Sequence, residues 1–115
     1  MNVKLSGTEI DALFLAHEEI EPGKYEEIII TCEAKVGSED IVEDQIIRQA
    51  KAPFKMRQIT QTRVIPIAVK CAGASTIFVI EFEELQKDSY KDVVSLAVAS
   101  ESLFEIKPPV PGICS

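Results

Sequence analysis

Glu33 and Lys35 are the residues whose types and spacing point most directly to chemistry. They lie two positions apart in an alternating run, so on a β-strand both side chains point to the same face. Asp11 lies upstream, and a Pro22-Gly23 turn signal separates it from the Glu33 segment. If the two segments form a hairpin, residues whose numbers sum to about 45 pair, and Asp11 falls diagonally beside Glu33 and Lys35.

Two carboxylates and an amine in one place suit a hard divalent cation. We expect Asp11 and Glu33 to bind Mg²⁺, with Mn²⁺ as the alternative ion. Such an ion keeps bound water and accepts phosphate oxygens, while Lys35 orients the water and offsets charge on the phosphate. The chemistry indicated is hydrolysis of a phosphodiester.

The segment from Tyr25 to Val36 is the most secure predicted strand, because apolar residues recur at every second position. One face carries Ile28, Ile30, Cys32, Ala34 and Val36, and the other carries Tyr25, Glu27, Ile29, Thr31, Glu33 and Lys35.

A helix from Glu39 to Lys51 is predicted to follow this strand. Gly37-Ser38 interrupts the alternation, and Ser38 can act as the N-cap. The first turn of the helix is acidic, which favours its formation, and the helix should end before Pro53. Its apolar stripe consists of Ile41, Val42, Ile46, Ile47 and Ala50.

The stretch from Thr8 to Ile20 is compatible with two structures. Ile10, Leu13 and His17 have helical spacing, and Ser6 with Glu9 forms a capping box. The same stretch also alternates apolar and other residues and precedes a turn, which favours the first arm of a hairpin. The chemical site depends on the hairpin.

The second half of the chain predicts another hairpin, from Arg63 to Cys71 and Thr76 to Glu84, turning at Ala72-Gly73-Ala74. Pro66 argues against a central position for the first of these strands. The stretch from Ser89 to Ile106 fits a helix or a strand, and a helix is favoured. The predicted fold class is α+β, with a mixed central sheet of about five strands and flanking helices.

These motifs resemble the PD-(D/E)XK nuclease superfamily. Glu9-Ile10-Asp11, the strand ending in Glu33-Ala34-Lys35 and a glutamine-bearing helix look most like its restriction-endonuclease-like members, and the likeness extends from about Val3 to Ile106. The sequence departs from the family pattern where Ile10 replaces proline, and where no helix fits before Val3.

The resemblance implies a magnesium-dependent deoxyribonuclease. Asp11 and Glu33 would be metal ligands, Lys35 the catalytic lysine and Glu9 a weaker candidate ligand. A helical glutamine would be an accessory group. Gln45 and Gln49 compete for that position, and Gln45 is preferred because it lies nearer the end of the strand.

The net charge of −7 is unusual for a DNA-binding protein, yet the stretch from Gln45 to Ile80 contains no acid. Its cations are therefore candidates for a local positive surface, although they could equally neutralise the acidic flanks. The candidate DNA contacts are Arg48, Lys51, Lys55 and Arg57, and the other two cations of the stretch are Arg63 and Lys70.

The 115 residues fit one domain, which we assign to 1–106, followed by a Pro-rich tail at 107–115. The sequence lacks a secretory leader or an apolar run of membrane-spanning length, so a cytoplasmic protein is expected. Three cysteines without a CxxC pair argue against disulfides and zinc.

Two functions remain open at this stage. The first is a DNA endonuclease, for which a homodimer is expected because cutting both strands usually pairs two sites. The second is a non-catalytic α+β interaction or dimerisation module, or a degenerate nuclease domain. Under that alternative, Glu33 and Lys35 form an ordinary solvated strand face, Thr8 to Ile20 is helical and no metal binds.

Overall fold

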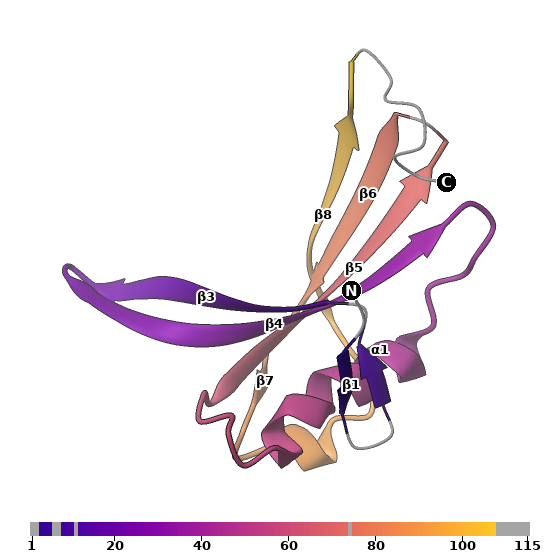
Figure 1. Ribbon diagram of the computed structural model, residues 1–115. Coiled ribbons are helices and arrows are strands. Elements are labelled where there is room, and N and C mark those ends of the chain that lie inside the picture. Colours follow the sequence, from indigo (N-terminus) through magenta and orange to yellow (C-terminus); the bar gives the residue numbers. More distant parts are fainter. Residues whose placement is uncertain (1–2, 6–7, 11, 74, 108–115) are drawn as a thin grey trace.

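The computed structural model describes residues 3–5, 8–10, 12–73 and 75–107, with side chains described from residue 12 onward (Figure 1). In chain order the elements are β1 (Val3–Leu5), β2 (Thr8–Ile10), β3 (Ala12–Glu21), β4 (Lys24–Val36), α1 (Glu43–Lys51), the 3-10 turn η1 (Ala52–Lys55), β5 (Arg63–Ala72), β6 (Thr76–Phe82), β7 (Leu85–Gln86), the 3-10 turn η2 (Tyr90–Asp92) and β8 (Val98–Glu105).

The main sheet has the strand order β3-β4-β5-β6-β8, and the short β7 pairs with β5. The β4–β5 pair is parallel and the other pairs are antiparallel. The prediction of an α+β fold with a mixed sheet is therefore confirmed. A separate small hairpin, β1–β2, contacts α1 and β4 through β2.

The stretch from Thr8 to Ile20 is extended wherever the structure describes it, so its helical interpretation is wrong. The β3–β4 partners are offset by one from the expected register, since Ala12 pairs with Cys32 and Phe14 with Ile30, and each pair of numbers sums to 44 rather than 45. Asp11 lies outside the described residues.

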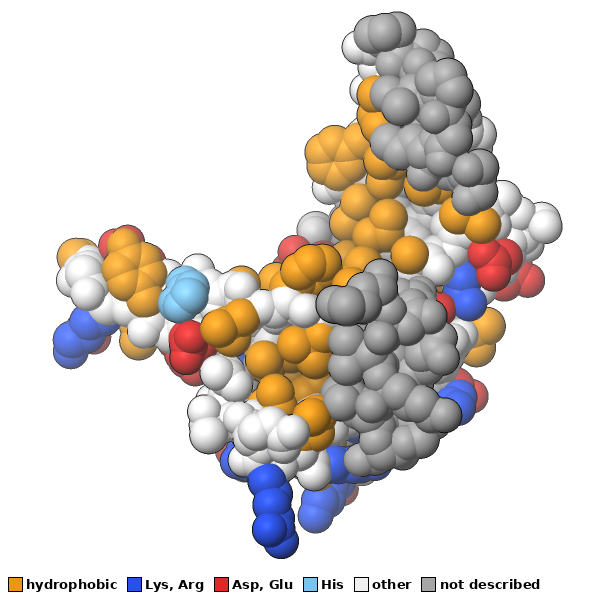
Figure 2. All heavy atoms as spheres, viewed as in Figure 1, with side chains coloured by type: hydrophobic (Ala, Val, Ile, Leu, Met, Phe, Trp, Pro, Cys, Tyr) orange, Lys and Arg blue, Asp and Glu red, His pale blue; other side chains and the backbone are white. Residues whose placement is uncertain are grey.

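The β3–β4 hairpin leaves the rest of the molecule as a long two-stranded arm (Figure 1). Gly23 at its tip has a φ of 80°, a left-handed conformation that glycine adopts without a steric penalty. Most of the arm is exposed, including Phe14, Leu15, Ile20 and Tyr25. Figure 2 shows hydrophobic side chains beside the single histidine on this arm.

The chain passes from β4 through α1 to the parallel strand β5, and the core lies between this helix and the sheet. One cluster contains Ile29, Ala50, Phe54, Val64 and Leu85, and a second contains Ile46, Ala68 and Phe82. The sheet face that packs on α1 is therefore the face that carries Glu33 and Lys35. In the parallel register this face continues onto β5, where Glu33 pairs with Ala68 and Lys35 with Lys70.

Helix α1 begins at Glu43, later than the predicted start at Glu39, and Ser38 is not its N-cap. The carboxylate of Glu39 instead accepts a hydrogen bond from the N–H of Val36, while the N–H of Glu39 bonds to the carbonyl of Val36. Glu39 therefore lies in a tight turn after β4, and it does not form the first turn of the helix as expected. The helix ends at Lys51 as predicted, and Pro53 lies in the 3-10 turn η1.

The C-terminal region is a strand rather than the favoured helix. After η2, β8 pairs with β6 and forms an edge of the sheet, with every residue exposed. Pro66 also lies in a central strand, contrary to expectation, at a point where β5 has no paired residue in β6 or β7. The sheet thus tolerates its missing N–H.

The N–H of Ile106 bonds to the carbonyl of Ser75, and of the predicted tail only Lys107 is among the described residues. No helix in the described part of the chain is long and apolar enough to cross a membrane.

Candidate functional site

Glu33 is a buried carboxylate, with 3% of the residue exposed. It lies on β4, on the sheet face that packs against α1. The Nζ of Lys35 lies 3.0 Å from Oε1 of Glu33, and the side-chain amide of Gln49 donates a hydrogen bond to Oε2. Burial of a charge is costly unless it is paired and hydrogen-bonded, and both conditions are met here.

The glutamine that reaches Glu33 is Gln49 rather than Gln45. Gln49 is 2% exposed, whereas Gln45 is only partly buried. Helical spacing explains the difference, because Gln49 lies three residues after Ile46 and next to Ala50, both buried on the stripe that faces the sheet. The position of Gln49 on this stripe is the signal that favours it. Gln45 was preferred instead because it lies nearer in sequence to the end of the Glu33 strand.

Asp11, the second expected metal ligand, is not among the described residues. For Glu9 the structure describes only the backbone, which pairs with Lys4 in the β1–β2 hairpin. In the part of the chain whose side chains are described, no group of three or more His, Cys, Asp or Glu residues is arranged to bind a metal.

The candidate DNA-contacting cations lie along α1 and just after it. Arg48, Lys55 and Arg57 are exposed and Lys51 is partly buried. Figure 2 shows Lys and Arg side chains at the lower end of the molecule, where α1 and η1 lie. Arg48 and Lys51 also line an open pocket of about 330 Å³ together with Asp44, Ile47, Val93 and Val94.

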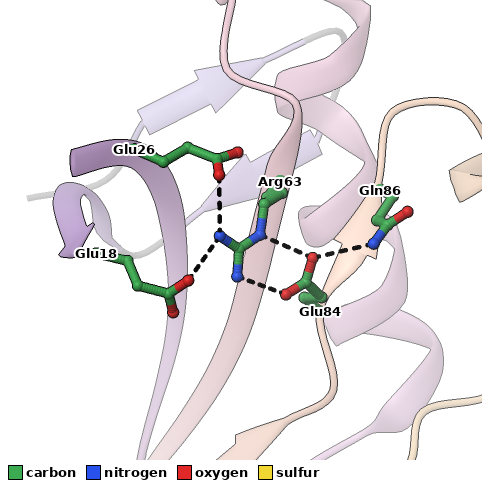
Figure 3. Close-up of polar contacts among 5 residues, drawn as sticks. All are labelled: Glu18, Glu26, Arg63, Glu84 and Gln86. Carbon is green, nitrogen blue, oxygen red and sulfur yellow. Dashed lines mark hydrogen bonds and ion pairs between the residues drawn. The ribbon is translucent and has the colours of Figure 1, made fainter. Parts of the chain in front are cut away.

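Arg63 is bound to acids of its own chain and is not available for phosphate (Figure 3). Its Nε and Nη2 donate to both carboxylate oxygens of Glu84 at 2.8 and 2.7 Å. Its Nη1 donates to Glu18 at 2.9 Å and Glu26 at 3.4 Å. The hydrogen bonds to Glu84 and Glu18 raise the pKa of Arg63, and the bond from Arg63 lowers the pKa of Glu84.

Cys32 directly precedes Glu33 in β4, so its side chain points to the opposite face of the sheet. His17 is on the arm, with 58% of its side chain exposed and its Nε2 3.4 Å from a carboxylate oxygen of Glu27. Cys32 and Cys71 are partly buried.

Lys70 is a residue that the sequence analysis placed only in the acid-free stretch. It is partly buried and pairs with Lys35 across the parallel strands β4 and β5. The apolar alternation shows which face of its strand each lysine occupies. It does not show that the two lysines are paired, because the register of parallel strands depends on the crossover helix and is not set by a turn.

No family profile, curated protein or solved structure matches this chain.

Proposed function

We propose that this protein is a magnesium-dependent endonuclease that hydrolyses DNA phosphodiester bonds, with a restriction-endonuclease-like fold. The observation that carries the proposal is the buried carboxylate of Glu33, bound between Lys35 and Gln49 at the end of β4. A solvated strand face would leave such a residue exposed, whereas this carboxylate is buried and held by an amine and an amide, which supports a functional role.

The order of elements supports the same proposal. The second strand of the β3–β4 hairpin carries Glu33-Ala34-Lys35 near its end, and a helix with a glutamine then leads to a parallel strand. This is the arrangement that the resemblance to restriction-endonuclease-like proteins implies.

The residues at the site suit a hard divalent cation, because carboxylate oxygens can accept further bonds beyond those from Lys35 and Gln49. Asp11 and Glu33 would bind Mg²⁺ or Mn²⁺, with Glu9 as a weaker candidate; the ion would supply an activated water and neutralise phosphate charge. Gln49 holds the Glu33 carboxylate in one orientation. Lys35, with 16% of its side chain exposed, is accessible enough to contact a phosphate oxygen.

The DNA would lie across α1 and η1, where Arg48, Lys51, Lys55 and Arg57 contact its phosphates. These contacts would position the protein on the DNA backbone without reading the base sequence, because phosphates are the same at every position. For duplex DNA, two copies of the chain would supply one site for each strand.

Cleavage of linear and supercoiled DNA in Mg²⁺ or Mn²⁺ tests the proposal directly. The wild-type protein should cut, and Lys35→Ala should lower kcat by about 100-fold or more, since the variant lacks the charge that stabilises the transition state. Asp11→Ala should also abolish cutting. Lys24→Ala is the matched control, because Lys24 is exposed on the arm and pairs only with Glu21 among the described residues.

Circular dichroism must show that each variant keeps the wild-type fold. If Lys35→Ala and Asp11→Ala cut as fast as the wild type, the assignment is wrong. A folded wild-type protein that neither cuts DNA nor binds Mg²⁺ would instead favour the non-catalytic interaction module.

A further inference from the structure

Two lysines lie side by side at the carboxyl ends of β4 and β5. Lys35 and Lys70 are register partners in the parallel pair, so their side chains leave the same sheet face on strands about 4.8 Å apart. Both are partly buried. Like charges directly opposite one another in a sheet are destabilising, so this pair requires a compensating interaction.

The compensation found among the described residues is incomplete. Glu33 forms an ion pair with Lys35, whereas no carboxylate in the described part of the chain lies within 4.0 Å of the Lys70 ammonium. Glu39, the exposed acid at this end of β4, bonds to the backbone N–H of Val36. Among the described residues, the Lys70 ammonium therefore has no acidic partner.

The layers of side chains along β4 and β5 show where an anion would bind. Successive register pairs on this face are Ile29 with Val64, Thr31 with Pro66, Glu33 with Ala68, and Lys35 with Lys70. The residues of the first three layers are buried, and those of the fourth are the first to be partly exposed. In open sheets with a crossover helix, ligands bind at the carboxyl ends of the parallel strands, and this is that end.

We propose that Lys70 binds a phosphate of the substrate strand, on the side of Lys35 that lies away from β3. The inference rests on the proposed nuclease function. We assign Lys35 to the chemical step because it contacts Glu33 on the same strand. Lys70 lies on the neighbouring strand β5, so we assign it to DNA binding. Lys70 is therefore a substrate-binding residue, whose loss weakens DNA binding and leaves the rate constant of the bound complex nearly unchanged.

The test measures DNA affinity and cleavage for the wild type, Lys70→Met, Lys70→Arg and the control Lys24→Met. Binding of a short DNA duplex is followed by fluorescence anisotropy in Ca²⁺ at several salt concentrations. Lys70→Met should raise Kd about tenfold and lower the slope of log K against log salt by about one. Lys70→Arg should restore most of the affinity, and Lys24→Met should bind as the wild type does.

Cleavage kinetics separate the two lysines. Lys70→Met should raise KM and leave kcat within about threefold of the wild type, whereas Lys35→Met should lose kcat. If Lys70→Met binds DNA as the wild type does while Lys35→Met no longer cuts, the role of Lys70 is wrong and the nuclease stands. If the wild type binds DNA through Lys70 but never cuts, the phosphate contact stands and the nuclease is wrong. A wild-type protein that binds no DNA would overturn the inference.

A further measurement distinguishes a binding role from a structural one. Removal of one of two repelling charges should raise the Tm of the free protein, so Lys70→Met should melt at a higher temperature than the wild type. Added inorganic phosphate should raise the Tm of the wild type more than that of Lys70→Met, because a ligand of the native state stabilises it. A fall in Tm with an unchanged response to phosphate would show that Lys70 only supports the fold.

Discussion

The carboxylate of Glu33 contacts an amide on one side and an ammonium on the other. An apolar side chain of the same size would fill this place without the cost of burying a charge, so stability alone does not explain the residue. The arrangement also keeps Glu33 in one rotamer, which is the requirement for a group that must present its oxygens in a fixed direction.

Gln49→Ala should lower the free energy of unfolding by about 1–3 kcal/mol, because the carboxylate of Glu33 then loses a buried hydrogen-bond partner. Gln45→Ala on the same helix is the matched control and should change it by less than about 0.5 kcal/mol. Urea denaturation of both variants checks the expectation. Equal effects of the two substitutions would contradict the assignment of Gln49 as the glutamine that orients Glu33.

The residues of the site could be predicted to different degrees. The shared face of Glu33 and Lys35 follows directly from their spacing in an alternating strand. The burial of that face could not be predicted, because Ile28 and Ile30 make the opposite face look like the core. Only the docking of α1 decides which side is covered, and that is tertiary information.

At the scale of elements, Arg63 connects the arm to the body of the molecule. It starts β5 and contacts Glu18 on β3, Glu26 on β4 and Glu84 after β6 (Figure 3). The pair with Glu84 is bidentate, the geometry in which an arginine binds a carboxylate most strongly. Arg63 thereby links both strands of the arm to the segment between β6 and β7.

Arg63→Met should destabilise the protein by about 1–2 kcal/mol at pH 7, because the variant cannot make these charged hydrogen bonds. The pKa of Glu84 is lowered from 4.5 in the folded protein, chiefly by Arg63. Its contribution to stability is therefore complete above pH 4.5 and is lost as the pH falls through the lower pKa of the folded state.

Denaturation of the wild type and Arg63→Met between pH 7 and pH 3 measures this difference. The gap in unfolding free energy should narrow below pH 4.5. Arg57→Met, which removes an exposed arginine, should show no such dependence. A gap of constant size throughout the range would mean that the Arg63 cluster does not stabilise the fold through Glu84.

The elements were predictable where one face is buried and the alternation or helical stripe is clear, as in β4, β5 and most of α1. The C-terminal strand β8 was not. Leu103 and Phe104 are adjacent and both exposed, so this edge strand has no single apolar face and no period to detect. It is stabilised by backbone pairing with β6, which leaves little trace in the sequence.

At the scale of the whole molecule, acids and cations are unevenly distributed. The arm carries Glu18, Glu19, Glu21, Glu26 and Glu27, while α1 and η1 carry exposed cations. A net charge of −7 repels DNA at long range, so under the proposed function DNA binding would depend on the exposed cations of α1 and η1.

Replacement of Arg48 and Lys55 by glutamine should lower the slope of log K against log salt by about 0.9 for each phosphate that is no longer neutralised. The double variant Lys24→Gln, Lys107→Gln makes the same change in net charge on the arm and at the end of β8. It should bind nearly as the wild type does. Anisotropy titrations at several salt concentrations compare the two, and an equal reduction in both would assign the effect to net charge rather than to α1 and η1.

The parallel pairing of β4 with β5 also has a consequence for synthesis of the chain. The β3–β4 hairpin is local and can form as soon as both strands have left the ribosome. Glu33 and Lys35 are then already present, but Gln49 and β5 are made later, and β5 can pair with β4 only after the crossover is complete. During translation the carboxylate of Glu33 is therefore exposed to solvent until α1 and β5 have been made.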